Sequence, residues 1–243
     1  MMMPAEDPIF DRGGIVPAPR WRDLAANLGA LAKDLTRFTG RAPVPPDLPR
    51  GDGHAVLVIP ALFSADYLTR GFRGALATLG YQVEGWGAGI NFGPTRSAWN
   101  AASERLFDIA TGSGQRVSLV GHSLGGVLAR ALAAEHPERV RRVITVCSPF
   151  RLPTASRLRP LYRALSYWHI DDATLISRTG APPPVPTTAI YSPRDGIVAW
   201  TSCVDEPGQG RENVAIDGPH STMLANPATI RIVADRLARD PGR

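Results

Sequence analysis

The chain of 243 residues is 44% hydrophobic and 20% charged, a balance that suits one globular domain and excludes a disordered or collagen-like protein. Its 24 glycines and 23 prolines indicate many sharp turns. The net charge of +5 comes from arginines spread along the chain, with Lys33 as the single lysine. Because no DNA-reading motif or aromatic-interleaved basic stretch accompanies these arginines, we expect no nucleic-acid partner.

Features of the ends and of the cysteines bear on the cellular compartment. The sequence has no run of 18 or more apolar residues, so we expect no transmembrane helix. Residues 1–7 lack the basic flank and apolar core of a signal peptide, which favours a cytoplasmic protein. Cys147 and Cys203 are too few for a disulfide framework. Free thiols are expected, and whether the two cysteines pair is left open.

Residues 1–53 are predicted to form an N-terminal extension. Apolar residues from Trp21 to Phe38 recur at steps of three and four, which predicts one amphipathic helix. We expect its apolar face to pack on the rest of the domain, and a membrane-surface or dimer contact is the alternative. A proline-rich linker follows over residues 40–53.

Residues 54–243 alternate short apolar runs with helical patterns. Strands are predicted at 54–59, 81–86, 116–120, 140–146, 188–191 and 214–216, and helices at 67–79, 97–110, 124–134 and 227–237. This alternation predicts an α/β domain with a mostly parallel sheet and helices on both faces. Residues 150–186 interrupt the alternation.

The most informative motif is Gly121-His122-Ser123-Leu124-Gly125, a G-x-S-x-G pattern between a predicted strand and a predicted helix. In this context the serine sits at a strained tip with its hydroxyl clear of the sheet. Glycine at 121 and 125 removes side chains that would collide with neighbouring strand and helix backbone. Ser123 is therefore the candidate nucleophile.

A serine hydroxyl needs a base that takes its proton, and the base needs a carboxylate to orient it. Three histidines follow Ser123 in the chain. His136 lies at the end of the predicted helix that follows Ser123. His169 lies in the segment 150–186 that interrupts the alternation. His220 follows the last predicted strand, and the order of strands in the sheet is expected to place its loop beside Ser123. His220 is therefore the candidate base.

The candidate orienting carboxylate is Asp195, in the turn that directly follows the predicted strand at 188–191. A turn at a strand end fixes the direction of the side chain. The alternative is that Asp195 only caps the turn before Gly196. Less favoured acids are Asp171, Asp172, Asp205 and Asp217.

Acyl chemistry at the serine also needs two backbone N–H groups pointed at the developing oxyanion. Leu124, directly after the nucleophile, is expected to supply the first. The loop after the first strand, Pro60-Ala61-Leu62-Phe63, is expected to supply the second. Leu62 is favoured by its position, with Phe63 as the alternative.

These motifs resemble the serine hydrolases of the α/β-hydrolase superfamily, and residues 54–238 are similar to small bacterial lipases and esterases. The resemblance rests on Gly-His-Ser-Leu-Gly-Gly, on Tyr-Ser-Pro-Arg-Asp-Gly-Ile-Val and on the loop of His220. The glycine-rich segment 85–94 also resembles a segment of related bacterial proteins. The resemblance implies the α/β-hydrolase fold, a triad of Ser123, Asp195 and His220, and chemistry without a metal or organic cofactor.

The chain departs from the family pattern at two places. Pro60-Ala61 stands where lipases of this type carry His-Gly after the first strand. Some relatives pair a cysteine at the position of Cys203 with one directly after the catalytic histidine, where this chain has Ser221.

Residues 150–186 lie where this superfamily places a cap over the site. We expect this segment to line a pocket, and the alternative is that its apolar residues close the core. An apolar cap favours an ester with a hydrophobic acyl or alkyl part. The expected substrate contacts are Phe63, His122, Leu161, Leu165 and Trp168.

The sequence therefore predicts a carboxylic ester hydrolase of the esterase or lipase type, acting on a small-molecule or lipid-like ester through an acyl-enzyme. An acyltransferase with the same triad, or a hydrolase fold used for binding without turnover, is the alternative. The acyl length, the oligomeric state and any peripheral membrane contact of the N-terminal helix are left open.

Overall fold

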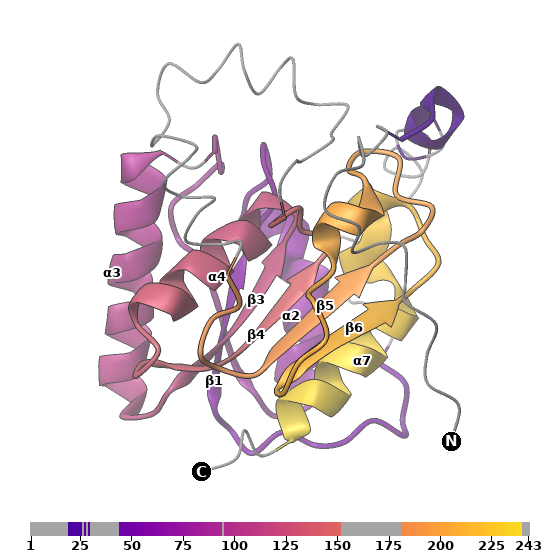
Figure 1. The fold of residues 1–243 in the computed structure, drawn as a ribbon. Helices are drawn as coiled ribbons and strands as arrows, with labels where there is room; N and C mark the ends of the chain where they lie inside the picture. The colour runs from indigo at the N-terminus through magenta and orange to yellow at the C-terminus, as the bar shows by residue number, and fades with distance from the viewer. Residues whose placement is uncertain are drawn as a thin grey trace.

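The computed structural model describes residues 19–25, 27, 29, 44–93, 95–151 and 181–239. Its strands form one sheet in the order β2-β1-β3-β4-β5-β6, and every neighbouring pair is parallel (Figure 1). The strands are β1 (Ala55–Ile59), β2 (Gln82–Gly85), β3 (Val117–His122), β4 (Val140–Val146), β5 (Thr187–Tyr191) and β6 (Arg211–Ala215). The predicted α/β sheet is confirmed.

Helices cover both faces of this sheet, as expected (Figure 1). They are α2 (Asp66–Thr78), α3 (Arg96–Ser113), α4 (Leu124–Glu135) and α7 (Pro227–Ala238), with 3-10 turns at Trp200–Cys203 and His220–Ala225. Helices α2 and α7 pack on one face, and α3 and α4 pack on the other. No helix within the described residues is long and apolar enough to cross a membrane.

Strand β1 shows why the strands are continuous apolar runs. Val56 and Val58 join the core under α2 and α7, whereas Leu57 and Ile59 join the core under α3 and α4. Because successive side chains of a strand point to opposite faces, a sheet covered on both sides needs apolar residues at every position.

Strand β6 begins three residues earlier than the predicted strand at 214–216. It pairs only with β5 in the described sheet, and its residues are half-buried or exposed. The polar residues Arg211 and Glu212 are therefore tolerated at this edge, and they give no apolar signal in the sequence.

Two parts of the predicted domain organisation lie partly outside the described residues. Residues 21–25, 27 and 29 are helical, which covers the beginning of the predicted N-terminal helix. Residues 44–53 form turns without helix or strand, as expected of a linker. The predicted cap is described only at 150–151 and 181–186, so the cap and the division at residue 53 stay predictions.

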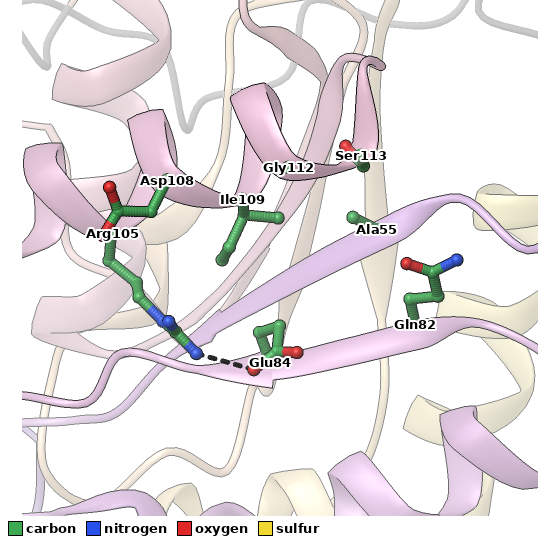
Figure 2. A pocket seen from close by; sticks show the side chains of 8 residues that line it. All are labelled: Ala55, Gln82, Glu84, Arg105, Asp108, Ile109, Gly112 and Ser113. Atoms are coloured by element: carbon green, nitrogen blue, oxygen red, sulfur yellow. Dashed lines mark hydrogen bonds and ion pairs between the residues drawn. The ribbon is translucent and has the colours of Figure 1, made fainter.

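A shallow pocket of about 250 Å³ lies between α3 and the first residues of β1 and β2 (Figure 2). Its wall carries the ion pair in which Arg105 Nη2 donates to Glu84 Oε2 over 2.6 Å. It is lined by Ala55, Gln82, Glu84, Arg105, Asp108, Ile109, Gly112 and Ser113. None of the candidate catalytic residues lines this pocket, which opens near the amino ends of the strands.

A buried ion pair joins α4 to the segment before β6. The guanidinium of Arg130 donates two hydrogen bonds of 2.8 Å to the carboxylate of Asp205, and it lies 3.8 Å from the ring centre of Phe150. Arg130 is fully buried and Asp205 is 3% exposed. The backbone N–H of Asp205 donates to Asn213 Oδ1 over 2.8 Å.

We expect Asp205→Ala to lower the free energy of unfolding by about 3–5 kcal/mol, because it leaves the Arg130 charge buried without this partner. Urea denaturation measures the effect. The control is Asp47→Ala, which removes an equally bidentate but exposed pair with Arg231 and is expected to shift the midpoint far less. Equal shifts for the two variants would contradict this account.

Candidate active site

The parallel sheet places the candidate residues together at the carboxyl ends of its strands, because the loops that follow parallel strands all begin there. Ser123 follows β3, the acid turn follows β5, and His220 follows β6. The loop 60–64 follows β1, which lies next to β3.

Ser123 occupies a sharp turn between β3 and α4. Its φ of 53° and ψ of −121° are unfavourable for a residue with a side chain. Its backbone N–H donates to the carbonyl of Val146 at the end of β4 over 2.8 Å. This strained conformation is typical of a nucleophile elbow.

The two glycines of the motif allow the elbow to pack against its neighbours. A Cβ at Gly121 would lie 2.4 Å from the carbonyl carbon of Gly125, and a Cβ at Gly125 would lie 2.2 Å from the carbonyl oxygen of Ile59. Both separations are shorter than any real contact. The predicted need for glycine at 121 and 125 is confirmed.

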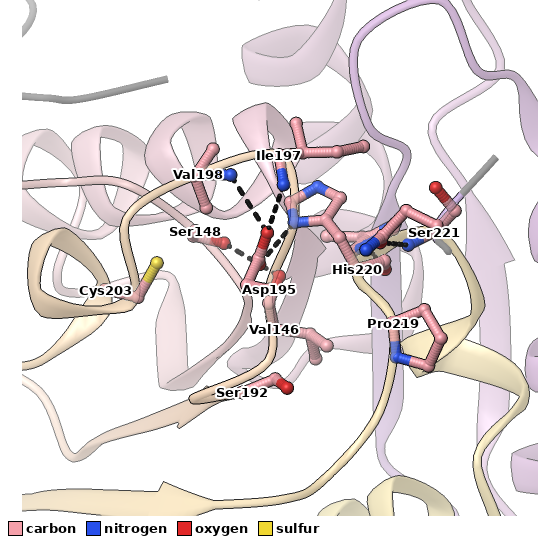
Figure 3. A network of polar contacts seen from close by, with 12 residues as sticks. Val146, Ser148, Ser192, Asp195, Ile197, Val198, Cys203, Pro219, His220 and Ser221 are labelled. Atoms are coloured by element: carbon pink, nitrogen blue, oxygen red, sulfur yellow. Dashed lines mark hydrogen bonds and ion pairs between the residues drawn. The ribbon is translucent and has the colours of Figure 1, made fainter. Parts of the chain in front are cut away.

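His220 and Asp195 form a direct pair (Figure 3). His220 Nδ1 lies 2.6 Å from Asp195 Oδ2, and both residues are at least 95% buried, with 4% and 5% exposed. The other oxygen, Oδ1, accepts the backbone N–H groups of Ile197 at 2.8 Å and Val198 at 2.9 Å. Because the carboxylate is held by these N–H groups, it fixes the direction of the imidazole.

His122 connects the elbow to the histidine loop. Its Nε2–H donates to the backbone carbonyl of His220 over 3.0 Å, and the two ring centres are 5.1 Å apart. His122, the residue directly before Ser123, therefore holds the loop of His220 against the elbow. The contacts within the described residues include no hydrogen bond between the side chains of Ser123 and His220.

Two further contacts position the loops of the acid and the histidine. Ser192 Oγ donates to the carbonyl of Gly218 over 2.6 Å and so ties one loop to the other. Asn27, in the N-terminal helix, is 1% exposed, and its Oδ1 accepts the N–H of Ser221 over 3.4 Å. A Cβ at Gly196 would lie 2.2 Å from the carbonyl oxygen of Asp23. The described part of this helix therefore packs on the domain beside the site.

The oxyanion candidates lie on two segments that touch, the loop 60–64 and the first turn of α4. A Cβ at Gly125 would lie 2.6 Å from the carbonyl oxygen of Pro60, which places α4 against the loop 60–64. The N–H of Phe63 already donates to the carbonyl of Asn91 over 2.7 Å. Within the described residues, the N–H groups of Leu62 and Leu124 have no hydrogen-bond acceptor.

Cys147 is the third potential ligand beside the acid and the histidine. Donor atoms of Cys147, Asp195 and His220 lie within 4.8 Å of one another, which is the only such group in the described part of the chain. Burial raises the pKa of the Cys147 thiol well above its usual range. Cys147 and Cys203 are both free and buried.

Two of the less favoured acids, Asp205 and Asp217, pair with arginines. Asp205 binds Arg130, and the exposed Asp217 lies 3.4 Å from Arg194 Nη1. His136 follows the last residue of α4, as expected. His169, Asp171 and Asp172, together with the expected substrate contacts Leu161, Leu165 and Trp168, lie outside the described residues.

The remaining expected substrate contacts differ in exposure. Phe63 is 38% exposed and forms an edge-on contact with Phe92, with ring centres 6.4 Å apart. His122 is 8% exposed, and its Nε2 is engaged with the carbonyl of His220. Phe63 therefore remains accessible to a ligand, whereas His122 supports the histidine loop.

A second group of serine, histidine and aspartate occurs at the opposite ends of the strands. His54 Nε2 lies 2.9 Å from Ser118 Oγ, and His54 Nδ1 contacts the carboxylate of Asp52. Ser118 is fully buried inside β3. A nucleophile in that position cannot reach a substrate, so this group holds β1 against β3.

Sequence reasoning missed the residues that support the site. Asn27, Asn91 and Ser192 are single polar residues whose amides or hydroxyls bind backbone groups of other loops. Asn91 lies in the glycine-rich segment 85–94 and Ser192 in the motif Tyr-Ser-Pro-Arg-Asp-Gly-Ile-Val, but neither pattern indicates which backbone group the side chain binds. The partners of Asn91 in the loop after β1 are 27 to 31 residues away and cannot be identified from sequence spacing.

The lowered pKa of His122 predicts how the free energy of unfolding depends on pH. Burial, together with the nearby His220, lowers this pKa from 6.5 to about 3. Between these pH values the unfolded chain binds a proton at His122 that the folded chain does not bind. The free energy of unfolding should therefore fall by up to about 1.4 kcal/mol for each pH unit below 6.5.

The variant His122→Gln lacks this titration, so its unfolding free energy should depend less steeply on pH between 6.5 and 4. Urea denaturation of both proteins across this range measures the difference. Identical slopes would show that His122 is not held neutral in the folded protein.

The chain is similar to proteins of known fold. A family model described as "alpha/beta hydrolase fold" matches residues 107–188, which include the elbow and β4 and end at the start of β5. No curated protein is significantly similar in sequence. Lipase B of Aspergillus fumigatus has a TM-score of 0.64 at 18% identity, with 82% of this chain matched. This chain spans 56% of the length of that lipase.

Two smaller enzymes match over nearly their whole length. An esterase of Pyrobaculum calidifontis has a TM-score of 0.61 at 14% identity, covering 89% of this chain and 92% of its own. A thermostable carboxylesterase from a metagenomic library has a TM-score of 0.60 at 13% identity, covering 91% and 98%. The family model and these solved structures show that the chain has the α/β-hydrolase fold.

Proposed function

We propose that the protein is a serine hydrolase that cleaves carboxylic esters through Ser123, His220 and Asp195. The observation that carries this proposal is the pairing of His220 Nδ1 with Asp195 Oδ2 at 2.6 Å, beside a strained serine elbow at the same edge of the sheet. A pair of this kind orients an imidazole so that its Nε2 can act as a base.

The reaction begins when Ser123 Oγ attacks the ester carbonyl carbon and its proton passes to His220 Nε2. The carbonyl oxygen becomes an oxyanion that accepts hydrogen bonds from the N–H groups of Leu62 and Leu124. The C–O bond to the alcohol then breaks, and His220 returns the proton to the departing alkoxide. Water, deprotonated by His220, attacks the acyl-enzyme and releases the acid and the free serine.

The surface beside the elbow favours a hydrophobic acyl or alkyl group. Phe63, next to the proposed oxyanion donor Leu62, is 38% exposed, and its partner Phe92 is 59% exposed. Exposed aromatic rings next to a reacting centre suit an apolar substrate part. The solved structures with the same fold include esterases and lipases, which agrees with this substrate class.

The central variant is Ser123→Ala, assayed with short- and medium-chain p-nitrophenyl esters. We expect wild-type hydrolysis and a loss of at least about 10³-fold in kcat for the variant, because the nucleophile is gone. The matched control is Ser118→Ala, which alters the buried second group and is expected to keep kcat within about threefold. Unchanged hydrolysis in Ser123→Ala would contradict the proposal.

The assignment of the acid is tested by Asp195→Asn. The amide cannot stabilise the imidazolium that forms when His220 takes the serine proton, so kcat should fall by about 10²- to 10⁴-fold. Asp217→Asn is the control, since Asp217 is only three residues from His220 but exposed. A larger loss in Asp217→Asn than in Asp195→Asn would assign the acid to Asp217 instead.

A further inference from the structure

The loop after β2, residues 87–93, is joined to the loop after β1 by one residue, Asn91. The side chain of Asn91 is 1% exposed. Its Nδ2 donates to the carbonyl of Pro60 over 2.8 Å, and its Oδ1 accepts the N–H of Gly93 over 3.1 Å. An amide buried in this way has both its donor and its acceptor engaged, which fixes its orientation.

The backbone of Asn91 makes two more contacts with the same loop. Its N–H donates to the carbonyl of Ser64 over 2.8 Å, and its carbonyl accepts the N–H of Phe63 over 2.7 Å. Phe63 has a φ of 57°, which is unfavourable outside glycine. Three hydrogen bonds from one residue therefore hold residues 60–64 in a shape that includes a strained position.

This arrangement engages the N–H groups of Phe63 and Ser64 and leaves those of Ala61 and Leu62 without an acceptor among the described residues. Asn91 uses the N–H of Phe63, and the N–H of Ser64 donates to the carbonyl of Ala61 over 3.0 Å. Leu62 lies directly before these two residues, and its N–H has no acceptor in the described part of the chain. The carbonyl of Pro60, held by Asn91 Nδ2, lies against Gly125 of the elbow.

Hydrogen bonds also hold the residues of the loop that precede Asn91. The indole Nε1–H of the buried Trp86 donates to the carbonyl of Gly89 over 2.9 Å. The carboxylate of Asp66 accepts the N–H groups of Trp86 at 3.1 Å and Gly87 at 3.0 Å. These contacts tie residues 86–89, just before Asn91, to one another and to the first residue of α2.

We propose that Asn91 is a positioning residue that shapes the oxyanion hole, by holding Pro60 and Phe63 so that the N–H of Leu62 is the donor. The inference rests on the proposed ester hydrolysis. It explains how the hole is built although Pro60-Ala61 replaces the family's His-Gly. Asn91 touches no reacting atom, and it acts only through the backbone of residues 60–64.

The test compares wild type with Asn91→Ala, Asn91→Asp and Asn213→Ala on one p-nitrophenyl ester. Asn91→Asp has nearly the same size and keeps an acceptor for Gly93, but its carboxylate has no donor for Pro60. Asn213→Ala is the matched control, because this amide also makes one donor and one acceptor bond to backbone, both of 2.8 Å with Asp205. Rates are expressed per serine titrated by a fluorophosphonate, so that unfolded protein does not count.

Both Asn91 variants are expected to lose about 10- to 100-fold in kcat, with KM within about threefold, because a misplaced donor weakens transition-state binding more than substrate binding. Asn213→Ala should keep kcat within about threefold. A kcat in both Asn91 variants no lower than in Asn213→Ala, or a loss confined to KM, overturns the role of Asn91 alone. Absence of hydrolysis by the wild type contradicts the proposed function, and the inference with it.

Discussion

The close packing of the elbow against the end of β1 is the constraint on which the site depends. Gly125 lies so near the carbonyls of Ile59 and Pro60 that no side chain fits between them. This contact sets the distance between the first turn of α4 and the loop 60–64. Because the proposed oxyanion donors Leu62 and Leu124 lie on these two segments, any residue larger than glycine at 125 would separate them.

The other half of the site depends on the ends of β5 and β6. Asp195 receives two backbone N–H groups on one oxygen and His220 on the other. Ser192 and Gly218 tie the two loops together, and His122 holds the histidine loop to the elbow. Each tie is a hydrogen bond to backbone, so the side chains of the proposed triad remain available for chemistry. Burial keeps His122 neutral. Its Nε2–H therefore donates the hydrogen bond to the carbonyl of His220 throughout the pH range near neutrality.

Much of this architecture could be predicted from the sequence because it depends on local patterns. Buried strands are apolar at each position, and the spacing of strands and helices predicted the parallel sheet and its two covered faces. The glycines of the elbow could be assigned because a G-x-S-x-G motif between a strand and a helix demands them. The pairing of His220 with Asp195 followed from the order of the loops along the sheet.

Features that depend on distant backbone groups could not be predicted. Asn91 holds Pro60 and Phe63 through hydrogen bonds, and Asn27 reaches Ser221 across 194 residues. A polar residue in a loop looks the same in a sequence whether its amide faces solvent or a carbonyl. The choice between Leu62 and Phe63 was open for the same reason, since a backbone donor has no side-chain signature.

The central claim, that Ser123 is the activated nucleophile, is tested most directly by locating a covalent adduct. The protein is treated with a fluorophosphonate, digested and mapped by mass spectrometry. The account predicts one modified residue, Ser123, and loss of the modification in His220→Ala, because the hydroxyl then has no base. An adduct on another serine, or labelling that persists without His220, would contradict it.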